Sequence, residues 1–393
     1  MRVGVDGACW ANRRGYGRFA REILAAMVTL APEHEFVCFV DPESRGCAPI
    51  EAPNMRLVVV RPTEAPTTAA ASDGSRSVVD LLRFSRAVWR EDLDVFFSPS
   101  VYTYFPLPPG LRSVVTVHDA IAERFPELTL PSRRARLFWN AKVALAMRQA
   151  RFVLTVSEYA KRDIASVHGF PEGRIRVAVE APADAYRPIS NRTAIRACAT
   201  EVGVPLEASW LMYVGGFNPH KNVNAIVRAH ARYVAEHPSD DPPHLVMVGH
   251  LEGDVFHGSL ASIRGEIEAA GTGHLVHWPG FVPDEDLAHL HSGALALLLV
   301  SEAEGFGLPA VEAAACGCPV IATTESPIPE LLPDGGIFVD PGDDEALFQA
   351  MRALIDDHSL RTTMATGALA GTSALSWERA AHAALHTLHA ALA

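Results

Sequence analysis

Nine residues in the last third of the chain place two carboxylates beside backbone that suits an anion. Residues 304–312 read Glu-Gly-Phe-Gly-Leu-Pro-Ala-Val-Glu, with Glu304 just before a predicted helix and Glu312 inside it. Pro309 marks the helix start, because proline is favoured in a first helical turn. The carboxylates can accept hydrogen bonds from sugar hydroxyls, while the amides of residues 305–308 face a phosphate. An ordinary helix cap does not explain the paired glycines or the second carboxylate, so the pattern favours a sugar-phosphate site.

A lysine follows another predicted strand. Residues 213–222 read Tyr-Val-Gly-Gly-Phe-Asn-Pro-His-Lys-Asn, which places Lys221 near the start of the next helix. The chain has only three lysines, and an unpaired cation at a helix N-terminus costs about 0.3–1 kcal/mol. A bound anion would reverse that cost, so the turn with Gly215, Gly216 and Lys221 indicates a pyrophosphate site.

Two turns in the first half of the chain also carry polar groups. His118 and Asp119 end a buried strand, at the edge of a sheet where functional side chains gather. A histidine in this place is often only a structural residue, so both interpretations stay open. The turn at residues 7–18 contains glycines that let the backbone approach a ligand, and its Arg13 and Arg14 can supply charge to a phosphate. It fits neither the dinucleotide-binding fingerprint nor a P-loop.

Runs rich in β-branched residues alternate with helical patterns along the whole chain. This alternation is typical of parallel sheets covered on both faces. The expected strands are residues 2–6, 35–40, 56–61, 94–98, 112–117, 152–156, 174–177, 210–214, 244–248, 275–277, 294–299, 320–322 and 337–339. The expected helices are residues 17–30, 78–91, 132–149, 158–168, 222–235, 284–291, 308–316, 343–356 and 376–392.

The strand-helix pattern restarts after prolines at 182, 188 and 205 break it. We therefore expect an α/β protein with two doubly wound, Rossmann-like domains that face each other across a cleft. The domains are residues 1–183 and 206–375, joined by a linker at 184–205. Residues 63–77 are rich in Ala, Thr, Ser and Pro and are expected to form a surface loop.

Charge and composition exclude several classes of protein. The chain of 393 residues carries a net charge of −12, and no domain has the basic excess that nucleic-acid binding needs. Its 49% hydrophobic content fits a globular protein rather than a disordered one. We see no signal peptide and no membrane-spanning run. The six cysteines lack metal-ligand spacing and fit reduced thiols, which predicts a cytoplasmic enzyme without a metal.

One predicted helix raises the question of membrane contact. Residues 132–149 carry five basic side chains beside Phe138 and Trp139. That composition suits an interfacial helix on an anionic membrane, although amphipathic helices more often cover a sheet. The chain is therefore expected in the cytoplasm, with peripheral contact to the inner face of the cell membrane left open.

With these residues assembled, the chain resembles the retaining glycosyltransferases of family 4, which share the GT-B architecture. The resemblance spans nearly the whole length, and its details are similar to the mannosyltransferase-like branch that builds polysaccharides. Glu304 and Glu312 form the E-x7-E element, the most specific mark of the family. The other matching segments are residues 14–18, 116–119, 156–162, 213–216, 280–283 and 317–320, in that order.

The resemblance implies a role for each matching residue. Glu304 holds hydroxyls of the donor sugar, Glu312 binds the ribose, and Lys221 binds the pyrophosphate. His118 lies beside the donor sugar near the reacting centre. The remaining implied donor contacts are the phosphate-covering Gly15 and Gly17, the turn at Gly215 and Gly216, and the backbone amides of Phe306, Gly307 and Leu308.

One position departs from the family pattern. Many relatives carry an arginine directly after the first glycine of the turn, and here that position is Gly216. Lys221 must then act with other donors, for which Arg13, Arg14 and His220 are candidates. Asp119 is a further candidate for contact with phosphate or acceptor.

The implied reaction is transfer of a hexosyl group, mannosyl among the options, from a nucleoside diphosphate sugar to an acceptor hydroxyl, with retention. The acceptor is a carbohydrate, a lipid-linked sugar or a small molecule, bound by the N-terminal domain. No D-x-D motif lies where a diphosphate-bound metal needs it, so neither metal nor cofactor is expected. The last helix, at 376–393, is implied to pack back on the N-terminal domain. The alternatives are a nucleotide-sugar epimerase of the same fold and a noncatalytic nucleotide- or carbohydrate-binding scaffold.

Overall fold

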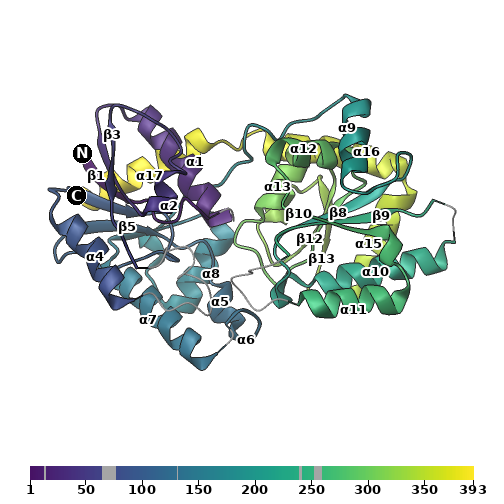
Figure 1. Ribbon diagram of the computed structural model, residues 1–393, viewed down its shortest axis with the longest axis horizontal. Coiled ribbons are helices and arrows are strands. Elements are labelled where there is room, and N and C mark those ends of the chain that lie inside the picture. Colours follow the sequence, from purple (N-terminus) through teal and green to yellow (C-terminus); the bar gives the residue numbers. More distant parts are fainter. Residues whose placement is uncertain (13–14, 64–76, 131, 239–240, 252–258) are drawn as a thin grey trace. The chain divides into compact units, whose positions relative to one another are not determined.

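All strands in the described part of the chain pair in parallel, in two separate sheets. The computed structural model describes residues 1–12, 15–63, 77–130, 132–238, 241–251 and 259–393. The chain divides into two compact units, shown in Figure 1. Unit 1 comprises Met1–Glu180 with Ser376–Ala393, and unit 2 comprises Ala181–Leu375. The predicted fold class, two doubly wound Rossmann-like α/β domains, is confirmed.

The sheet of unit 1 has its strands in the order β3-β2-β1-β4-β5-β6-β7. The order reverses beside β1, which pairs with both β2 and β4. The central strands β1, β2, β4, β5 and β6 are mostly apolar and buried, as expected for a parallel sheet with both faces covered, whereas the edge strand β3 is partly exposed. They are β1 (Arg2–Asp6), β2 (Glu35–Val40), β3 (Met55–Val59), β4 (Val95–Ser98), β5 (Arg112–Thr116), β6 (Phe152–Thr155) and β7 (Ile175–Val177).

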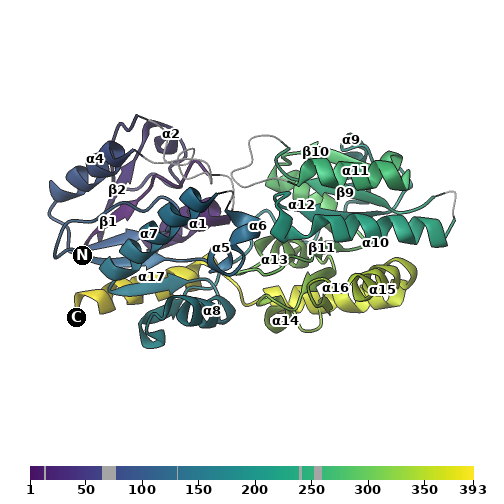
Figure 2. The same ribbon diagram turned by 90° about the horizontal axis from the view of Figure 1, so that it is seen from below.

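The helices of unit 1 begin at capping residues and bury their apolar faces on the sheet. The side chains of Ser132, Ser157 and Ser376 each accept a hydrogen bond from a first-turn amide of the helix that follows. The last helix, α17, packs against α1 and strands β4 to β7 (Figures 1 and 2). The helices are α1 (Gly15–Leu30), α2 (Pro42–Arg45), α4 (Val78–Trp89), α5 (Ile121–Arg124), α6 (Pro126–Thr129), α7 (Arg133–Gln149), α8 (Glu158–His168), η1 (Glu172–Arg174) and α17 (Trp377–Leu392).

The sheet of unit 2 has the order β10-β9-β8-β11-β12-β13, with its reversal beside β8. Its strands are β8 (Trp210–Val214), β9 (His244–Val248), β10 (Val276–Gly280), β11 (Leu297–Leu299), β12 (Val320–Thr323) and β13 (Gly336–Val339). Its helices are α9 (Arg192–Glu201), η2 (Pro219–Lys221), α10 (Val223–Glu236), α11 (Leu260–Ala270), η3 (Gly273–Leu275), α12 (Asp284–Gly293), α13 (Leu308–Ala315), α14 (Ile328–Leu331), α15 (Asp344–Asp356) and α16 (His358–Thr372).

The predicted strands and helices are all present, with ends that differ by up to three residues. Residues 184–205, expected as a linker, instead contain helix α9, and unit 2 already begins at Ala181. The prolines that suggested a break lie outside the helix, and Asn191 caps its start. Helices α11 and α16 were also not expected. The loop predicted at 63–77 falls on residues 64–76, which lie outside the described residues.

Candidate active site

The site in unit 2 centres on an ion pair between the two residues singled out by their spacing. Lys221 Nζ donates a hydrogen bond to Glu304 Oε1 over 2.7 Å. Ser301 Oγ donates to the same oxygen over 2.5 Å. Glu304 is only 8% exposed, and these two short bonds therefore orient its carboxylate within the turn. The structure therefore brings Lys221 and Glu304 together, although they come from different strand-helix turns.

Lys221 is held by a tight turn between β8 and α10. It is the last residue of η2, and Asn222, which follows, adopts a left-handed conformation with φ of 53°. Among the described residues Asn222 is the only non-glycine with positive φ. Asparagine tolerates that conformation better than most residues, so the turn lets Lys221 precede the helix instead of joining it. The amide of Glu302 donates to the His220 carbonyl over 2.8 Å and ties this turn to the one after β11.

The turn into α13 is shaped by a glycine. Gly307 has a φ of 87° and stands immediately before the helix, with Pro309 in its first turn. A Cβ there would lie 3.0 Å from Ile328 side-chain atoms, so conformation and space both require glycine. The side chains of Phe306 and Leu308 are buried, at 4% and 7% exposure. What this turn can offer a ligand is consequently its backbone amides.

The second carboxylate of the pair lies inside α13. Glu312 is 4% exposed on a helix otherwise made of small and apolar residues. An ionised carboxylate in such a place needs polar partners, because its transfer from water is costly. The family resemblance assigns this carboxylate to the donor, and the structure places it within the helix that begins after Gly307.

Close contact between turns fixes the glycines after β8. The Tyr213 hydroxyl donates to the Gly216 carbonyl, and the Gly215 amide donates to the Val248 carbonyl over 3.0 Å. A Cβ on Gly249 would lie 2.1 Å from the Gly215 carbonyl oxygen. The turns after β8 and β9 are thus packed backbone to backbone at the carboxyl edge of the sheet.

In unit 1 the structure places His118 directly beyond β5, in a buried setting. Its Nε2 lies 3.1 Å from the Pro99 carbonyl oxygen, so this nitrogen carries the proton. Its Nδ1 lies 3.7 Å from Glu180 Oε1. The ring of Phe19 meets the imidazole edge to face at 4.9 Å between centroids. These contacts hold the ring in one orientation while 9% of the residue stays exposed.

The other predicted site residues of unit 1 that the structure describes are explained mainly by local hydrogen bonding and packing. Asp119 Oδ1 accepts a hydrogen bond over 3.0 Å from the amide of Ile121, the first residue of α5. Gly17 is required by packing, because a Cβ would lie 2.0 Å from the Asn12 carbonyl oxygen. A Cβ on the exposed Gly15 would meet no described atom within 4 Å. Arg13 and Arg14 lie outside the described residues.

Two residues of the sites were missed in the sequence. Ser301 follows β11 and Glu180 follows β7, each at the carboxyl edge of its sheet. That position is a signal in itself, since ligands of parallel sheets bind there. Ser301 shares an oxygen with Lys221, and Glu180 faces His118. Within the described ranges, no group of three or more His, Cys, Asp or Glu residues is arranged to hold a metal ion.

Two further features of the described residues concern membrane-spanning helices and cysteines. None of the helices in the described ranges is both long enough and apolar enough to cross a membrane. All six cysteines are free thiols, and five of them are buried.

Comparison with known families covers both units. Residues 13–178 match the Glycosyltransferase Family 4 model, and residues 200–369 match the model of glycosyl transferases group 1. The O-antigen chain mannosyltransferase B of Escherichia coli is 28% identical over 76% of this chain and 75% of its own. A D-inositol 3-phosphate glycosyltransferase of Nocardioides sp. is 29% identical over 72% of this chain and 61% of its own.

Solved structures with the same fold span the whole chain. Sucrose-phosphate synthase from Thermosynechococcus elongatus has a TM-score of 0.74 at 18% identity, covering 100% of this chain and 99% of its own. Anabaena HepE in complex with UDP-glucose has a TM-score of 0.71 at 17% identity, covering 99% of this chain and 100% of its own.

The two parallel-sheet units define the GT-B class of glycosyltransferases. Within that class the N-terminal part of the chain matches glycosyltransferase family 4 and the C-terminal part matches glycosyl transferases group 1, with relatives among mannosyltransferases and inositol phosphate glycosyltransferases.

Proposed function

We propose that the protein transfers a hexosyl group from a nucleoside diphosphate sugar to an acceptor hydroxyl with retention of anomeric configuration. The observation that carries this proposal is the bond of 2.7 Å between Lys221 Nζ and Glu304 Oε1. It places a cation that suits a diphosphate beside a carboxylate that suits sugar hydroxyls, at the carboxyl edge of a parallel sheet.

The ion pair would reorganise when the donor binds. The diphosphate is a stronger partner for the ammonium group of Lys221 than one carboxylate, because it carries more charge on more oxygens. Glu304 is then released to accept hydrogen bonds from the sugar, while Ser301 keeps it oriented. The amides of Gly307 and Leu308 are assigned to the phosphate in this proposal. The buried Glu312 is assigned to the ribose hydroxyls.

Catalysis then consists of charge stabilisation on the leaving diphosphate. The bond between the anomeric carbon and the phosphate oxygen breaks, and Lys221 with the backbone amides stabilises the negative charge that develops. The acceptor hydroxyl forms its bond on the face that the diphosphate leaves and gives its proton to a phosphate oxygen. His118, held by Pro99 and Glu180, is assigned to the donor sugar near the reacting centre. No metal takes part in this scheme.

The relatives support a narrower choice of substrates. An O-antigen mannosyltransferase and inositol phosphate glycosyltransferases favour transfer to a carbohydrate or a cyclitol phosphate, with mannose as the first sugar to test. A structural neighbour with UDP-glucose supports a nucleoside diphosphate donor. Such an enzyme would act in the cytoplasm.

Peripheral membrane contact is part of the same proposal. Helix α7 exposes 69% of Leu137 and 54% of Phe138, and Arg134 lies over the Phe138 ring at 5.5 Å. Exposed apolar groups among arginines suit an anionic bilayer surface. Flotation with anionic vesicles at low and physiological salt tests this, and no binding at either salt refutes it.

A donor panel followed by product analysis tests the transfer. Thermal shifts with uridine, guanosine and thymidine diphosphate sugars identify the donor, since a ligand at about 100 times its Kd adds about 2.7 kcal/mol of stability. NMR of the product then reports the anomeric configuration. Glycosylated acceptor with retained configuration supports the proposal, whereas an altered nucleotide sugar alone indicates an epimerase. The absence of both transfer and donor hydrolysis across the panel indicates a noncatalytic scaffold.

A further inference from the structure

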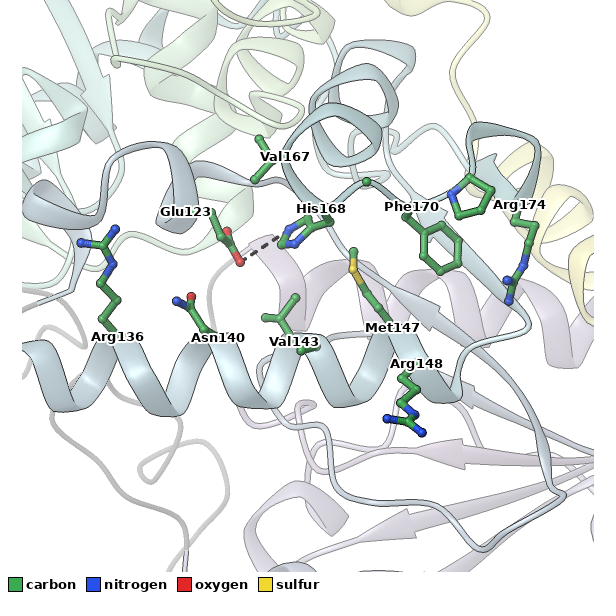
Figure 3. A pocket seen from close by; sticks show the side chains of 13 residues that line it. Glu123, Arg136, Asn140, Val143, Met147, Arg148, Val167, His168, Phe170 and Arg174 are labelled. Atoms are coloured by element: carbon green, nitrogen blue, oxygen red, sulfur yellow. Dashed lines mark ion pairs between the residues drawn. The ribbon is translucent and has the colours of Figure 1, made fainter.

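Unit 1 contains a groove that has no part in the site described above. It lies between α7 and the connection from α8 to β7, with Glu123 of α5 at one end (Figure 3). Its volume is about 620 Å³, within the range of about 300–1,000 Å³ that small-molecule sites occupy. Arg174 lies just before β7 and Arg148 shortly before β6. That end of the groove is therefore at the amino-terminal edge of the sheet, opposite the edge that holds His118.

The polar end of the groove contains an imidazole nitrogen that lacks a hydrogen bond. His168 Nε2 is buried and has no hydrogen-bond partner among the described residues. It points toward Glu123, whose Oε1 is 3.6 Å away, too far for a hydrogen bond (Figure 3). That carboxyl oxygen already accepts a bond of 2.7 Å from Trp139 Nε1. Buried nitrogens of this kind normally have a partner, so a ligand atom is the missing one.

The ionisation of these two groups makes the end of the groove nearly neutral. Burial raises the pKa of Glu123 to about 7, with Asp119 and Asp163 adding to the effect. Burial also lowers the pKa of His168, so its ring is uncharged at neutral pH. The amide of Asn140 lies on the face of α7 that points to the same pair (Figure 3). Donors and acceptors are thus mixed within one small volume.

The other end of the groove is apolar. Met147 of α7 faces Phe170 of the connection after α8, and Val143 lies one turn earlier on the same face of α7 (Figure 3). Arg174 lies over the Phe170 ring at 4.9 Å and donates to the carbonyls of Ala150 and Arg151. These bonds hold the guanidinium group against the backbone, and the surface that Met147 and Phe170 form beside it is apolar.

The arrangement of charge disfavours an anionic ligand. Arg136 lies 3.7 Å from Glu127 Oε1, which offsets its charge. Arg148 projects away from Glu123 and His168 (Figure 3), and Arg174 is occupied. A phosphate or carboxylate at the polar end would meet the partly protonated Glu123 and the uncharged ring of His168, so that end offers it no fixed cation among the described residues.

We infer that this groove binds carbohydrate, as a subsite for one or two sugar residues of the acceptor chain. A hydroxyl is the group that both donates and accepts, so one ligand hydroxyl bridges Glu123 and His168, and a neighbouring one reaches Asn140. The C–H face of the sugar ring packs on Met147, Val143 and Phe170. This inference rests on the proposed function, because it takes the ligand to be the acceptor of that transfer.

The subsite would hold the acceptor away from the reacting hydroxyl. Its occupancy then changes the KM for acceptors long enough to reach it and leaves kcat and the use of short acceptors unchanged. His168 and Asn140 are positioning residues in this account, since neither touches the reacting atoms.

Binding without donor tests the subsite directly. The probes are α-linked mannotriose and, as a second sugar, maltotriose, with Kd measured by saturation-transfer NMR on the full chain. We expect His168→Ala and Asn140→Ala each to weaken binding of the better probe at least tenfold, and His168→Gln, which keeps a hydrogen-bond donor, to restore part of it. Ser166→Ala, exposed on the same helix and outside the groove, is the matched control. Thermal unfolding of every variant verifies its fold.

The outcomes separate this inference from the proposed function. No binding of either sugar to the unaltered protein, or equal binding to His168→Ala and Ser166→Ala, overturns the subsite. Stronger competition by inorganic phosphate than by monosaccharide also overturns it. Absence of donor hydrolysis and transfer, with probe binding that still depends on His168, refutes the transferase and leaves a carbohydrate site. If transfer occurs and the KM for long acceptors is the same in the unaltered protein and in His168→Ala, the subsite is refuted and the transferase is not.

Discussion

The two units have similar strand orders, and in both of them burial lowers the pKa of histidines. In unit 2 these are His230, His244, His277 and His291, and in unit 1 they are His34 and His168. Unit 1 also contains Glu123, whose pKa burial raises to about 7. The buried histidines resist gaining a proton, and Glu123 resists losing one. Glu123 and the buried histidines therefore make opposite contributions to the dependence of stability on pH.

The carboxyl edges of the two sheets differ in a related way. In unit 1, His118 contacts Pro99 and Glu180, and Asp119 accepts a hydrogen bond from the Ile121 amide, so the protein itself holds these groups. In unit 2, Lys221 is neutralised by Glu304, and each group is chemically suited to part of a donor. In the proposed function the pair of unit 2 exchanges its partner for the donor, whereas the groups of unit 1 stay bound to the protein, so equivalent edges of one fold can hold side chains in two different ways.

The largest expected effect concerns the acid sensitivity of unit 2. His291 is fully buried, neither ring nitrogen has a hydrogen-bond partner among the described residues, and burial lowers its pKa from 6.5 to about 3. Above pH 6.5 the ring is neutral in both the folded and the unfolded chain. As pH falls from 6.5 toward 3, only the unfolded chain binds a proton at His291, so the stability of the folded protein decreases by up to about 5 kcal/mol. His291→Leu should flatten this loss in denaturant unfolding at pH 7, 5.5 and 4. His289→Leu, partly exposed on the same helix, is the control, and equal pH profiles for the two variants would contradict the comparison.

The next largest effect concerns the exchangeable pair. Lys221→Ala should lower kcat by about 100- to 1,000-fold, or about 3–4 kcal/mol, because a preorganised group for the leaving diphosphate is lost. Glu304→Ala should cause a loss of the same order. Lys161→Ala is a close control, since Lys161 has similar exposure, 21% against 20%, and also pairs with carboxylates. Steady-state kinetics with unchanged circular dichroism would measure this, and near-normal turnover in both site variants would sink the assignment.

Glu123 should show the opposite pH trend in unit 1. Its folded pKa of about 7 lies above the ordinary value of 4.5. Stability linked to this proton is therefore full below pH 4.5 and is lost as pH rises to about 7, by up to about 3 kcal/mol. Glu123→Gln should stabilise the protein at pH 8 and change little at pH 4.5, while still accepting the Trp139 bond. Glu127→Gln, on the exposed neighbouring helix, serves as control. A stabilisation that is the same at pH 4.5 and pH 8 would contradict the expected loss of stability with rising pH.

The smallest expected effect concerns one helix cap in each unit. Ser157 accepts a hydrogen bond from the Ala160 amide in unit 1, and Asn191 accepts one from the Ala194 amide in unit 2. Alanine at either position should cost about 1 kcal/mol. If the units unfold separately, each variant shifts one calorimetric transition and leaves the other. Shifts of a single shared transition by both variants would show instead that the units unfold together.

Much of this architecture is readable in the sequence, because buried parallel strands are continuous apolar runs. Residues such as Trp210–Val214 and Glu158–His168 match their predicted elements to the residue. Helix α9 was missed because flanking prolines suggested a break, whereas they lie just outside it. Lys221 and Glu304 were found through local spacing beside helix starts.

Partners brought together by the fold were harder to predict. Glu180 faces His118, and Ser301 shares an oxygen of Glu304 with Lys221. The spacing of a residue within its own turn does not reveal which other turn lies beside it. The same reason hides the groove, in which Glu123 and His168 come from two different crossovers of the sheet.

Because α17 packs on unit 1, the order of translation affects how the two units fold. The chain of unit 1 is interrupted after Glu180 and resumes at Ser376, with all of unit 2 between them. On the ribosome, the N-terminal sheet emerges without the helix that covers α1 and strands β4 to β7. Unit 2 is continuous and can finish folding first, although it is translated second. One continuous stretch of the gene therefore encodes unit 2, whereas two separate stretches encode unit 1.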